Sequence, residues 1–111
     1  MNQSNSKYVF SLEDVHNHDD PDGDGLWVIV DSYVLDLTAF LQKHPAGGKK
    51  ILQRRNKAID ISSNFLDHFG HTVRTFKDAC REHEKTGERV TFRFKEVAEP
   101  VHLIGKVRSS P

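Results

Sequence analysis

Residues 44–48 read His-Pro-Ala-Gly-Gly, a sequence that strongly restricts the backbone. Pro45 disfavours helical dihedral angles at the residue before it, so a helix that runs into this segment is expected to end near His44. Gly47 and Gly48 carry no side chains and leave room for a flat ligand to approach the main chain. The segment therefore predicts an imidazole at a helix end, on a stiff turn, beside an open space.

A second histidine, His71, lies between Gly70 and Thr72. Gly70 is suited to end a preceding helix in a left-handed cap, and Thr72 is suited to cap the next helix. We therefore expect His71 at a junction between helices as well. Two imidazoles held by rigid neighbours could bind one metal centre between them.

The ordered set of motifs resembles the cytochrome b5 family over residues 7–95. The family has a Thr-x-Phe-Leu helix start, a His-Pro-Gly-Gly signature, a second histidine near an Asn-Phe pair and, upstream, a first strand and helix and a Trp-bearing strand. The matching segments here are Lys7–Val15, Leu26–Val30, Asp36–Leu41, His44–Gly48, Asn64–Asp67 and Gly70–Thr72.

The resemblance implies an α+β fold in which a small mixed β-sheet and two helical hairpins form a haem cleft. It also implies a noncovalently bound haem b with His44 and His71 as axial ligands. Cys80 lacks the Cys-x-x-Cys-His pattern of covalent attachment. The residues expected to contact the cofactor surround the two histidines: Phe40, Pro45, Gly47, Gly48, Ile51, Leu52, Phe65, Phe69 and Phe76.

The second ligand has a rival, because the chain departs from the family pattern in two ways. Ala46 interrupts the signature, and His71 lies 27 positions after His44, a wider spacing than is usual in the family. His68 lies 24 positions after His44, close to the usual spacing. We prefer His71 because its two neighbours match the residues that flank the family's second histidine.

The function implied by the resemblance is electron transfer. Two histidines and four porphyrin nitrogens would fill all six positions on iron, so that only its oxidation state could change. The chain is therefore expected to be a carrier between a flavoprotein reductase and an acceptor protein, and not an enzyme. A basic run next to the signature could attract acidic partner surfaces. It comprises Lys49, Lys50, Arg54, Arg55 and Lys57.

The alternative function on the same fold is a non-redox module that binds haem for sensing or delivery, or that mediates interactions. Refusal of electrons from a reductase would favour this alternative.

Length and composition limit the remaining possibilities. A chain of 111 residues suits one domain, expected to be monomeric, with tails at 1–6 and 96–111. Sixteen basic and sixteen acidic residues cancel, which gives no indication of nucleic acid binding. No apolar run approaches the ~20 residues of a membrane span, and the polar start lacks a signal-peptide core. We therefore expect a soluble, cytoplasmic protein.

A calcium site is one alternative reading of an acidic segment. Asp20, Asp22, Asp24, Gly25 and Asp31 fit positions of an EF-hand loop. Calcium prefers a bidentate Glu at the last of these positions, and the apolar residues that precede Asp31 favour a strand. An acidic surface turn is therefore the preferred interpretation.

A zinc site is the other alternative. His68, His71, Cys80 and His83 could supply four tetrahedral ligands. This hypothesis leaves the signature at 44–48 without a role, and Cys80 belongs to an apolar helix stripe.

The secondary structure expected from local patterns is as follows. Strands are predicted at 7–10, 26–30, 33–37 and 89–95, with a turn at Asp31-Ser32. Helices are predicted at 11–16, 38–43, 48–55, 59–69 and 72–85, the first opened by Ser11 in a capping box, the second capped by Thr38 and the last ended by Gly87.

Overall fold

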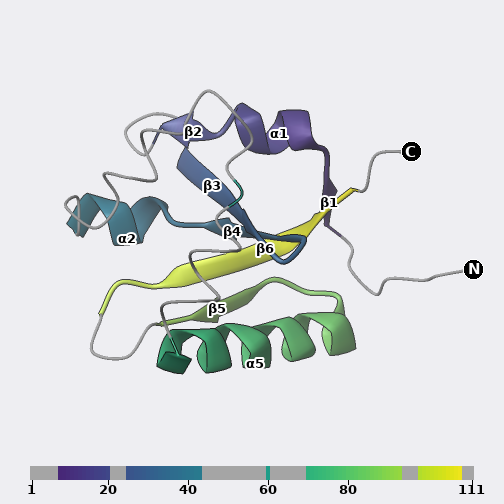
Figure 1. Ribbon diagram of the computed structural model, residues 1–111, viewed down its shortest axis with the longest axis vertical. Coiled ribbons are helices and arrows are strands. Elements are labelled where there is room, and N and C mark those ends of the chain that lie inside the picture. Colours follow the sequence, from purple (N-terminus) through teal and green to yellow (C-terminus); the bar gives the residue numbers. More distant parts are fainter. Residues whose placement is uncertain (1–7, 21–24, 44–59, 61–69, 94–97, 109–111) are drawn as a thin grey trace, which may run out of the picture.

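The computed structural model describes residues 8–20, 25–43, 60, 70–93 and 98–108. Within these residues a six-stranded mixed β-sheet is flanked by helices, in the strand order β1-β6-β4-β3-β2 with β5 also paired to β6 (Figure 1). The elements are β1 Val9–Phe10, α1 Leu12–His16, β2 Asp19–Asp20, β3 Gly25–Val30, β4 Tyr33–Asp36, α2 Thr38–Lys43, α5 Gly70–Thr86, β5 Val90–Phe92 and β6 Val101–Val107. The expected α+β fold with a mixed sheet is confirmed. None of the helices in this part of the chain is long and apolar enough to cross a membrane.

The first helix begins where its capping box predicts. The hydroxyl of Ser11 accepts a hydrogen bond from the backbone N–H of Asp14 at 3.0 Å, and the Asp14 carboxylate accepts from the N–H of Ser11 at 2.9 Å. Two backbone donors at the helix start are thereby satisfied within four residues. These bonds with Ser11 also lower the pKa of the exposed Asp14 carboxyl below its ordinary value.

The predicted hairpin is formed by β3 and β4, which pair in antiparallel register from Trp27 opposite Asp36 to Val30 opposite Tyr33. Its two turn residues, Asp31 and Ser32, have φ angles of 53° and 71°. A two-residue turn with positive φ at both positions matches the right-handed twist of the strands that it joins.

The expectation that residues 96–111 form a tail is wrong. Residues Val101–Val107 form β6, which pairs in parallel with β1 and antiparallel with β4 and β5. The side chains of Val101, Leu103 and Ile104 are at most 3% exposed. This strand is therefore a central part of the sheet, and its partners come from residues up to about a hundred positions earlier in the chain.

The apolar side chains form two clusters on opposite faces of the sheet. The larger cluster lies between the sheet and α5 and consists of Leu26, Val28, Val30, Leu35, Leu37, Phe76, Ala79, Cys80, Val101 and Leu103. The smaller cluster lies under α1 and consists of Val15, Ile29, Val34 and Ile104. Successive strand residues point to opposite faces, which explains why Val28 and Ile29 belong to different clusters.

The helix predicted at 59–69 is wrong at its start. Asp60 forms an isolated parallel β-bridge with Ile29, so residue 60 extends the sheet and does not begin a helix. The rest of this predicted helix, and the one predicted at 48–55, lie outside the described residues.

The next helix, α5, starts at Gly70 and ends at Thr86. Gly87 terminates it as predicted, with φ of 75° and an N–H that donates to the carbonyl of His83 at 2.7 Å. The fully buried His83 donates from Nδ1 to the carbonyl of Glu88 at 2.5 Å. The end of α5 is thereby fixed by directional bonds.

Gly105→Ala is expected to lower the free energy of unfolding by about 1–3 kcal/mol, the usual cost of overpacking. A Cβ at Gly105 would meet the carbonyl oxygen of Tyr8 and lie 2.7 Å from the ring of Phe10, so β1 would have to move away from β6. Urea denaturation measures the change. Lys77→Ala, on the exposed surface of α5, is the control and should change stability by less than about 0.5 kcal/mol. Equal stability of Gly105→Ala and wild type would contradict this close approach.

Candidate functional site

Helix α2 leads to the first candidate ligand, because its last residue is Lys43 and His44 follows directly. Its start is joined to the central hairpin by Thr38. The Thr38 hydroxyl donates to Asp36 Oδ1 at 2.5 Å and accepts from the N–H of Leu26 at 3.0 Å. The same Asp36 oxygen accepts from the Thr38 N–H at 2.9 Å. The predicted helix bounds are confirmed, but Thr38 is the first helical residue, and its side chain joins α2 to β3 instead of capping the helix.

Helix α5 carries the second candidate ligand, because His71 is its second residue. The expected junction at residues 70–72 is therefore corrected: the backbone is already helical at Gly70, and Thr72 does not cap a new helix. One face of α5 is buried against the sheet through Phe76, Ala79 and Cys80. The backbone of His71 thus belongs to a helix that the core holds in place.

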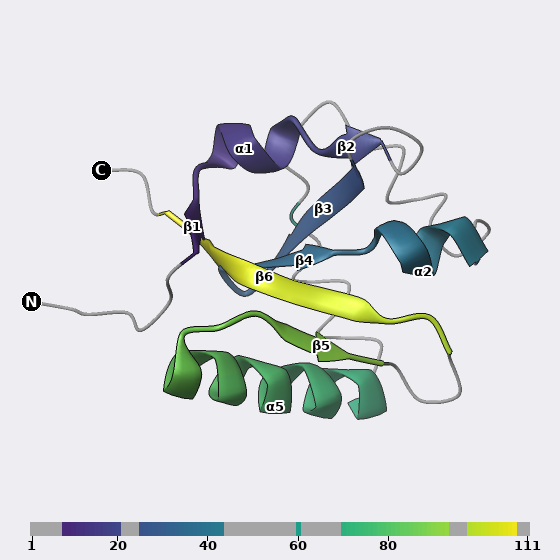
Figure 2. The ribbon, with the colours of Figure 1, turned by 180° about the vertical axis from the view of Figure 1, so that it is seen from behind.

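The two helices cover the same face of the sheet. Phe40 of α2 and Val73 of α5 are both half-buried and pack against the larger apolar cluster. The last residue of α2 and the first residues of α5 lie at the same end of the molecule, away from both chain termini, in both views (Figures 1 and 2). The fold thus brings the end of α2 and the start of α5 to one end of the molecule, over one face of the sheet.

Most residues predicted to contact the cofactor lie outside the described part of the chain. These are His44, Pro45, Gly47, Gly48, Ile51, Leu52, Phe65 and Phe69, together with the rival ligand His68 and the basic residues Lys49, Lys50, Arg54 and Arg55.

Two predicted contact residues are described, and their burial differs. Phe40 is half-buried and keeps some free surface, whereas Phe76 has an exposed fraction of 0%. Phe76 belongs to the larger apolar cluster, and its contact with the cofactor stays a prediction. Val73, one turn closer to His71, is also half-buried and is a further candidate for the wall of a site. The three- and four-residue spacing of Val73, Phe76 and Cys80 is the sequence pattern that predicted the buried face of α5.

The calcium hypothesis is wrong. An EF-hand loop has to bring its twelfth residue back to its first, but Gly25–Val30 is an extended strand. Six residues of strand place Asp31 about 20 Å from Gly25. Asp31 instead occupies the turn of the β3–β4 hairpin.

The zinc hypothesis is also wrong. His71 and Cys80 lie nine residues apart on the single helix α5, which separates them by about 14 Å along its axis. Zinc ligand atoms lie about 2.0–2.3 Å from the metal, so these two residues cannot share one ion. Among the described residues, no group of three or more His, Cys, Asp or Glu side chains is placed to hold a metal ion.

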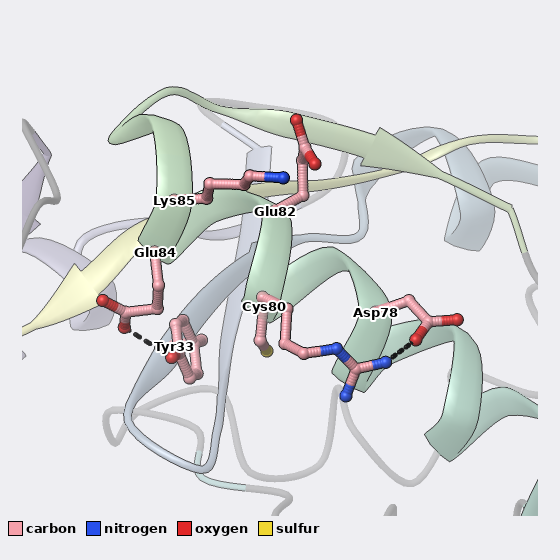
Figure 3. Close-up of a pocket in the computed structure, with 7 residues that line it drawn as sticks. Tyr33, Asp78, Cys80, Glu82, Glu84 and Lys85 are labelled. Carbon is pink, nitrogen blue, oxygen red and sulfur yellow. Dashed lines mark hydrogen bonds and ion pairs between the residues drawn. The ribbon is translucent and has the colours of Figure 1, made fainter.

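An open depression of about 670 Å³ lies beside the second half of α5, where Tyr33, Cys80 and Glu84 are among its lining residues (Figure 3). Burial raises the pKa of the Tyr33 hydroxyl above its usual range and raises the pKa of the Cys80 thiol to about 12. Both groups are therefore protonated at neutral pH and are poor nucleophiles. Because Glu84 lies 13 residues after His71, about 20 Å along the helix, this depression is separate from the candidate ligand site.

Alkylation of Cys80 by iodoacetamide at pH 7.5 is expected to be at least about a hundredfold slower than that of a free cysteine. A pKa raised from 9.0 to about 12 reduces the thiolate fraction, and the residue is only 8% exposed. Mass spectrometry of timed samples measures the rate. The urea-denatured chain is the control and should react at the rate of a free thiol. A native rate equal to the denatured rate would contradict the burial of this helix face.

The family model described as the cytochrome b5-like haem/steroid binding domain matches residues 11–108. Cytochrome b5 of Saccharomyces cerevisiae is 30% identical over 86 residues, which cover 75% of this chain and 68% of the yeast protein. Cytochrome b5 of Rattus norvegicus is 40% identical over 64 residues, which cover 58% of this chain and 44% of the rat protein. The chain therefore spans about two thirds of the yeast protein and less than half of the rat protein.

Among solved structures, the cytochrome b5 of Ostreococcus tauri virus 2 is similar to this chain, with a TM-score of 0.53 and 25% sequence identity. The match covers 90% of this chain and 96% of the viral chain. The match to the family model extends through β6, which agrees with the place of that strand in the sheet.

Proposed function

Because the chain belongs to the cytochrome b5-like haem/steroid binding domain family, we propose that it is an electron-transfer protein that holds haem b between His44 and His71. The observation that carries the proposal is the placement of two helices. Helix α2 ends at the residue before His44, α5 begins with Gly70 and His71, and both pack on one face of the sheet. Neutral imidazole is a common axial ligand of haem iron, so the donor chemistry fits.

Bound haem supplies an iron centre that changes its oxidation state by one electron. His44 and His71 together would leave no axial position for oxygen or a substrate. Helices α2 and α5 are joined to the sheet by directional hydrogen bonds and apolar packing, which supports the proposal that ligands next to α2 and on α5 keep their positions in both oxidation states. These features support a carrier over an enzyme.

The test is a titration of the purified protein with hemin, followed by absorption spectroscopy. We expect a low-spin ferric spectrum that saturates at one equivalent, and a ferrous form that does not bind carbon monoxide because both axial positions are taken. A protein that stays colourless throughout the titration would overturn the haem site. Carbon monoxide binding by the ferrous form would overturn the proposed bis-histidine ligation.

The proposed partners are a flavoprotein reductase and an acceptor protein, and stopped-flow reduction tests this part. Rapid reduction is expected, at a rate that falls as ionic strength rises if acidic partner surfaces dock on Lys49, Lys50, Arg54 and Arg55. A protein that binds hemin but accepts no electrons from any reductase would be a haem-binding module without a carrier role.

Removal of haem is expected to lower the melting temperature. A ligand that binds only the folded state stabilises it by about 2.7 kcal/mol when its free concentration is 100 times its dissociation constant. Circular dichroism of the apo and holo proteins at equal concentration measures the shift. Equal melting temperatures would show that haem does not bind the folded state preferentially.

A further inference from the structure

The carboxylate of Glu84 joins α5 to two strands of the sheet. Its Oε2 accepts a hydrogen bond from the Tyr33 hydroxyl at 2.6 Å and from Lys106 Nζ at 2.7 Å. Tyr33 begins β4 and Lys106 lies near the end of β6. Figure 3 shows the Glu84 carboxylate directed at the Tyr33 hydroxyl. The three residues are called the Glu84 anchor below.

The charges of the Glu84 anchor favour this arrangement. Hydrogen bonds from Lys106 and Tyr33 lower the pKa of the Glu84 carboxyl, so it is ionised at neutral pH. Lys106 Nζ also lies 5.3 Å from the centre of the Tyr33 ring, a distance that allows a cation–π interaction. The side chains of Lys106 and Glu84 are 27% and 36% exposed, so the ion pair is partly screened by water. The ion pair is therefore expected to contribute little to the free energy of unfolding and to act mainly on the geometry of α5.

Apolar contacts hold one face of α5 against the sheet. The buried residues Phe76, Ala79 and Cys80 are held by packing, which has little directional preference. Hydrogen bonds, in contrast, weaken steeply when their angles change. Two such bonds on one carboxylate oxygen add a directional restraint to this packing, on how α5 is turned and on how far it is shifted along the sheet.

A helix transmits rotation about its axis along its whole length. A rotation of about 10° displaces an atom about 6 Å from the axis by about 1 Å. Functional groups generally have to be held within about 0.5 Å of their productive position. The backbone of His71 lies on the same uninterrupted helix as Glu84, so a rotation at one end of α5 also turns the backbone at residue 71.

We propose that Glu84, held by Tyr33 and Lys106, is a positioning residue for His71, and that it sets the orientation of that imidazole as an iron ligand. The inference rests on the proposed haem function. It predicts that loss of the Glu84 anchor changes the ligand field of the iron and speeds haem release, although Glu84 itself touches neither.

The experiment compares Glu84→Ala and Tyr33→Phe with a matched control, Asp78→Ala. Asp78 is an exposed carboxylate on the same helix and pairs with Arg81 within that helix, so its replacement makes the same charge change without touching the sheet. Ferric electron paramagnetic resonance reports the mutual orientation of the axial ligands, and haem transfer to excess apomyoglobin reports release. Amide chemical shifts of residues 72–75 in the haem-free protein report the start of α5 without the cofactor.

We expect Glu84→Ala and Tyr33→Phe to shift the g-values, to speed haem release about tenfold and to move the amide signals of residues 72–75. Asp78→Ala should leave release within about twofold of wild type. Glu84→Gln, which keeps an acceptor for Tyr33, should restore part of the wild-type behaviour. Unchanged g-values, release rates and amide shifts in Glu84→Ala, with only a lower melting temperature, would reduce Glu84 to an ordinary stabilising residue. Failure of the wild type to form a low-spin haem complex would instead overturn the proposed function, and this inference with it.

Discussion

Replacing either His44 or His71 with alanine is expected to abolish the low-spin haem spectrum, whereas His68→Ala is expected to keep it. Each proposed ligand supplies one axial nitrogen, and its loss leaves the iron five-coordinate. We expect haem affinity to fall at least about a hundredfold in each ligand variant, which corresponds to about 2.7 kcal/mol. Absorption spectra of the ferric and ferrous proteins and hemin titrations measure both effects.

Two controls separate loss of a ligand from loss of the fold. Added imidazole should restore a low-spin spectrum to His44→Ala and His71→Ala, because a free ligand can occupy the vacated position. His102→Ala changes a histidine on β6 whose Nδ1 lies 2.9 Å from the hydroxyl of Thr91, and it should leave the spectrum unchanged. A normal spectrum in His71→Ala together with its loss in His68→Ala would transfer the ligand role to His68.

Elements whose determinants are close in sequence were predicted correctly. The capping box needs only Ser11 and Asp14, and the hairpin turn needs only Asp31 and Ser32 between two apolar runs. Gly87 ends α5 through a bond to a residue four positions earlier. Each of these signals acts over a few residues, so it is visible without knowledge of the tertiary structure.

Strand β6 was missed because its stability is not local. Its sequence contains only a short apolar alternation that Gly105 interrupts, and the composition of segment 96–111 predicted a tail. The strand forms because it pairs with three other strands, β1, β4 and β5, which contain Val9, Val34 and Val90 respectively. Such pairings depend on the whole sheet, so the β-propensity and the hydrophobic periodicity of the segment itself cannot predict them.

Spacing patterns for metal ligands failed for a similar reason. The calcium pattern counted positions along the chain, but the residues between Gly25 and Asp31 are extended. The zinc pattern combined His71 with Cys80, which one continuous helix keeps apart. The candidate haem site was found through the order of several motifs, whereas the contacts of Glu84 with Tyr33 and Lys106 span 51 and 22 positions and had no sequence signal.

Removal of β6 is the second change with a large expected effect. A chain that ends after residue 98 should show no cooperative unfolding transition and no specific hemin binding. Full burial of a Val, Leu or Ile side chain contributes about 1.5–3 kcal/mol, so Val101, Leu103 and Ile104 together account for roughly 5–9 kcal/mol. The whole stability of a domain of this size is about 5–15 kcal/mol. Three strands would also lose a pairing partner. Circular dichroism in a urea series measures the outcome.

A control chain that lacks only residues 109–111 keeps all of β6 and should unfold with an unchanged midpoint. A chain ending after residue 98 that retains a cooperative transition at the wild-type midpoint would contradict the central role of β6. The outcome also bears on the proposed ligand site, because α5 packs on a cluster that contains Val101 and Leu103. Without those two side chains, the helix that carries His71 would lose part of the surface that holds it. The truncation is therefore expected to abolish haem binding even though it leaves both proposed ligands in the chain.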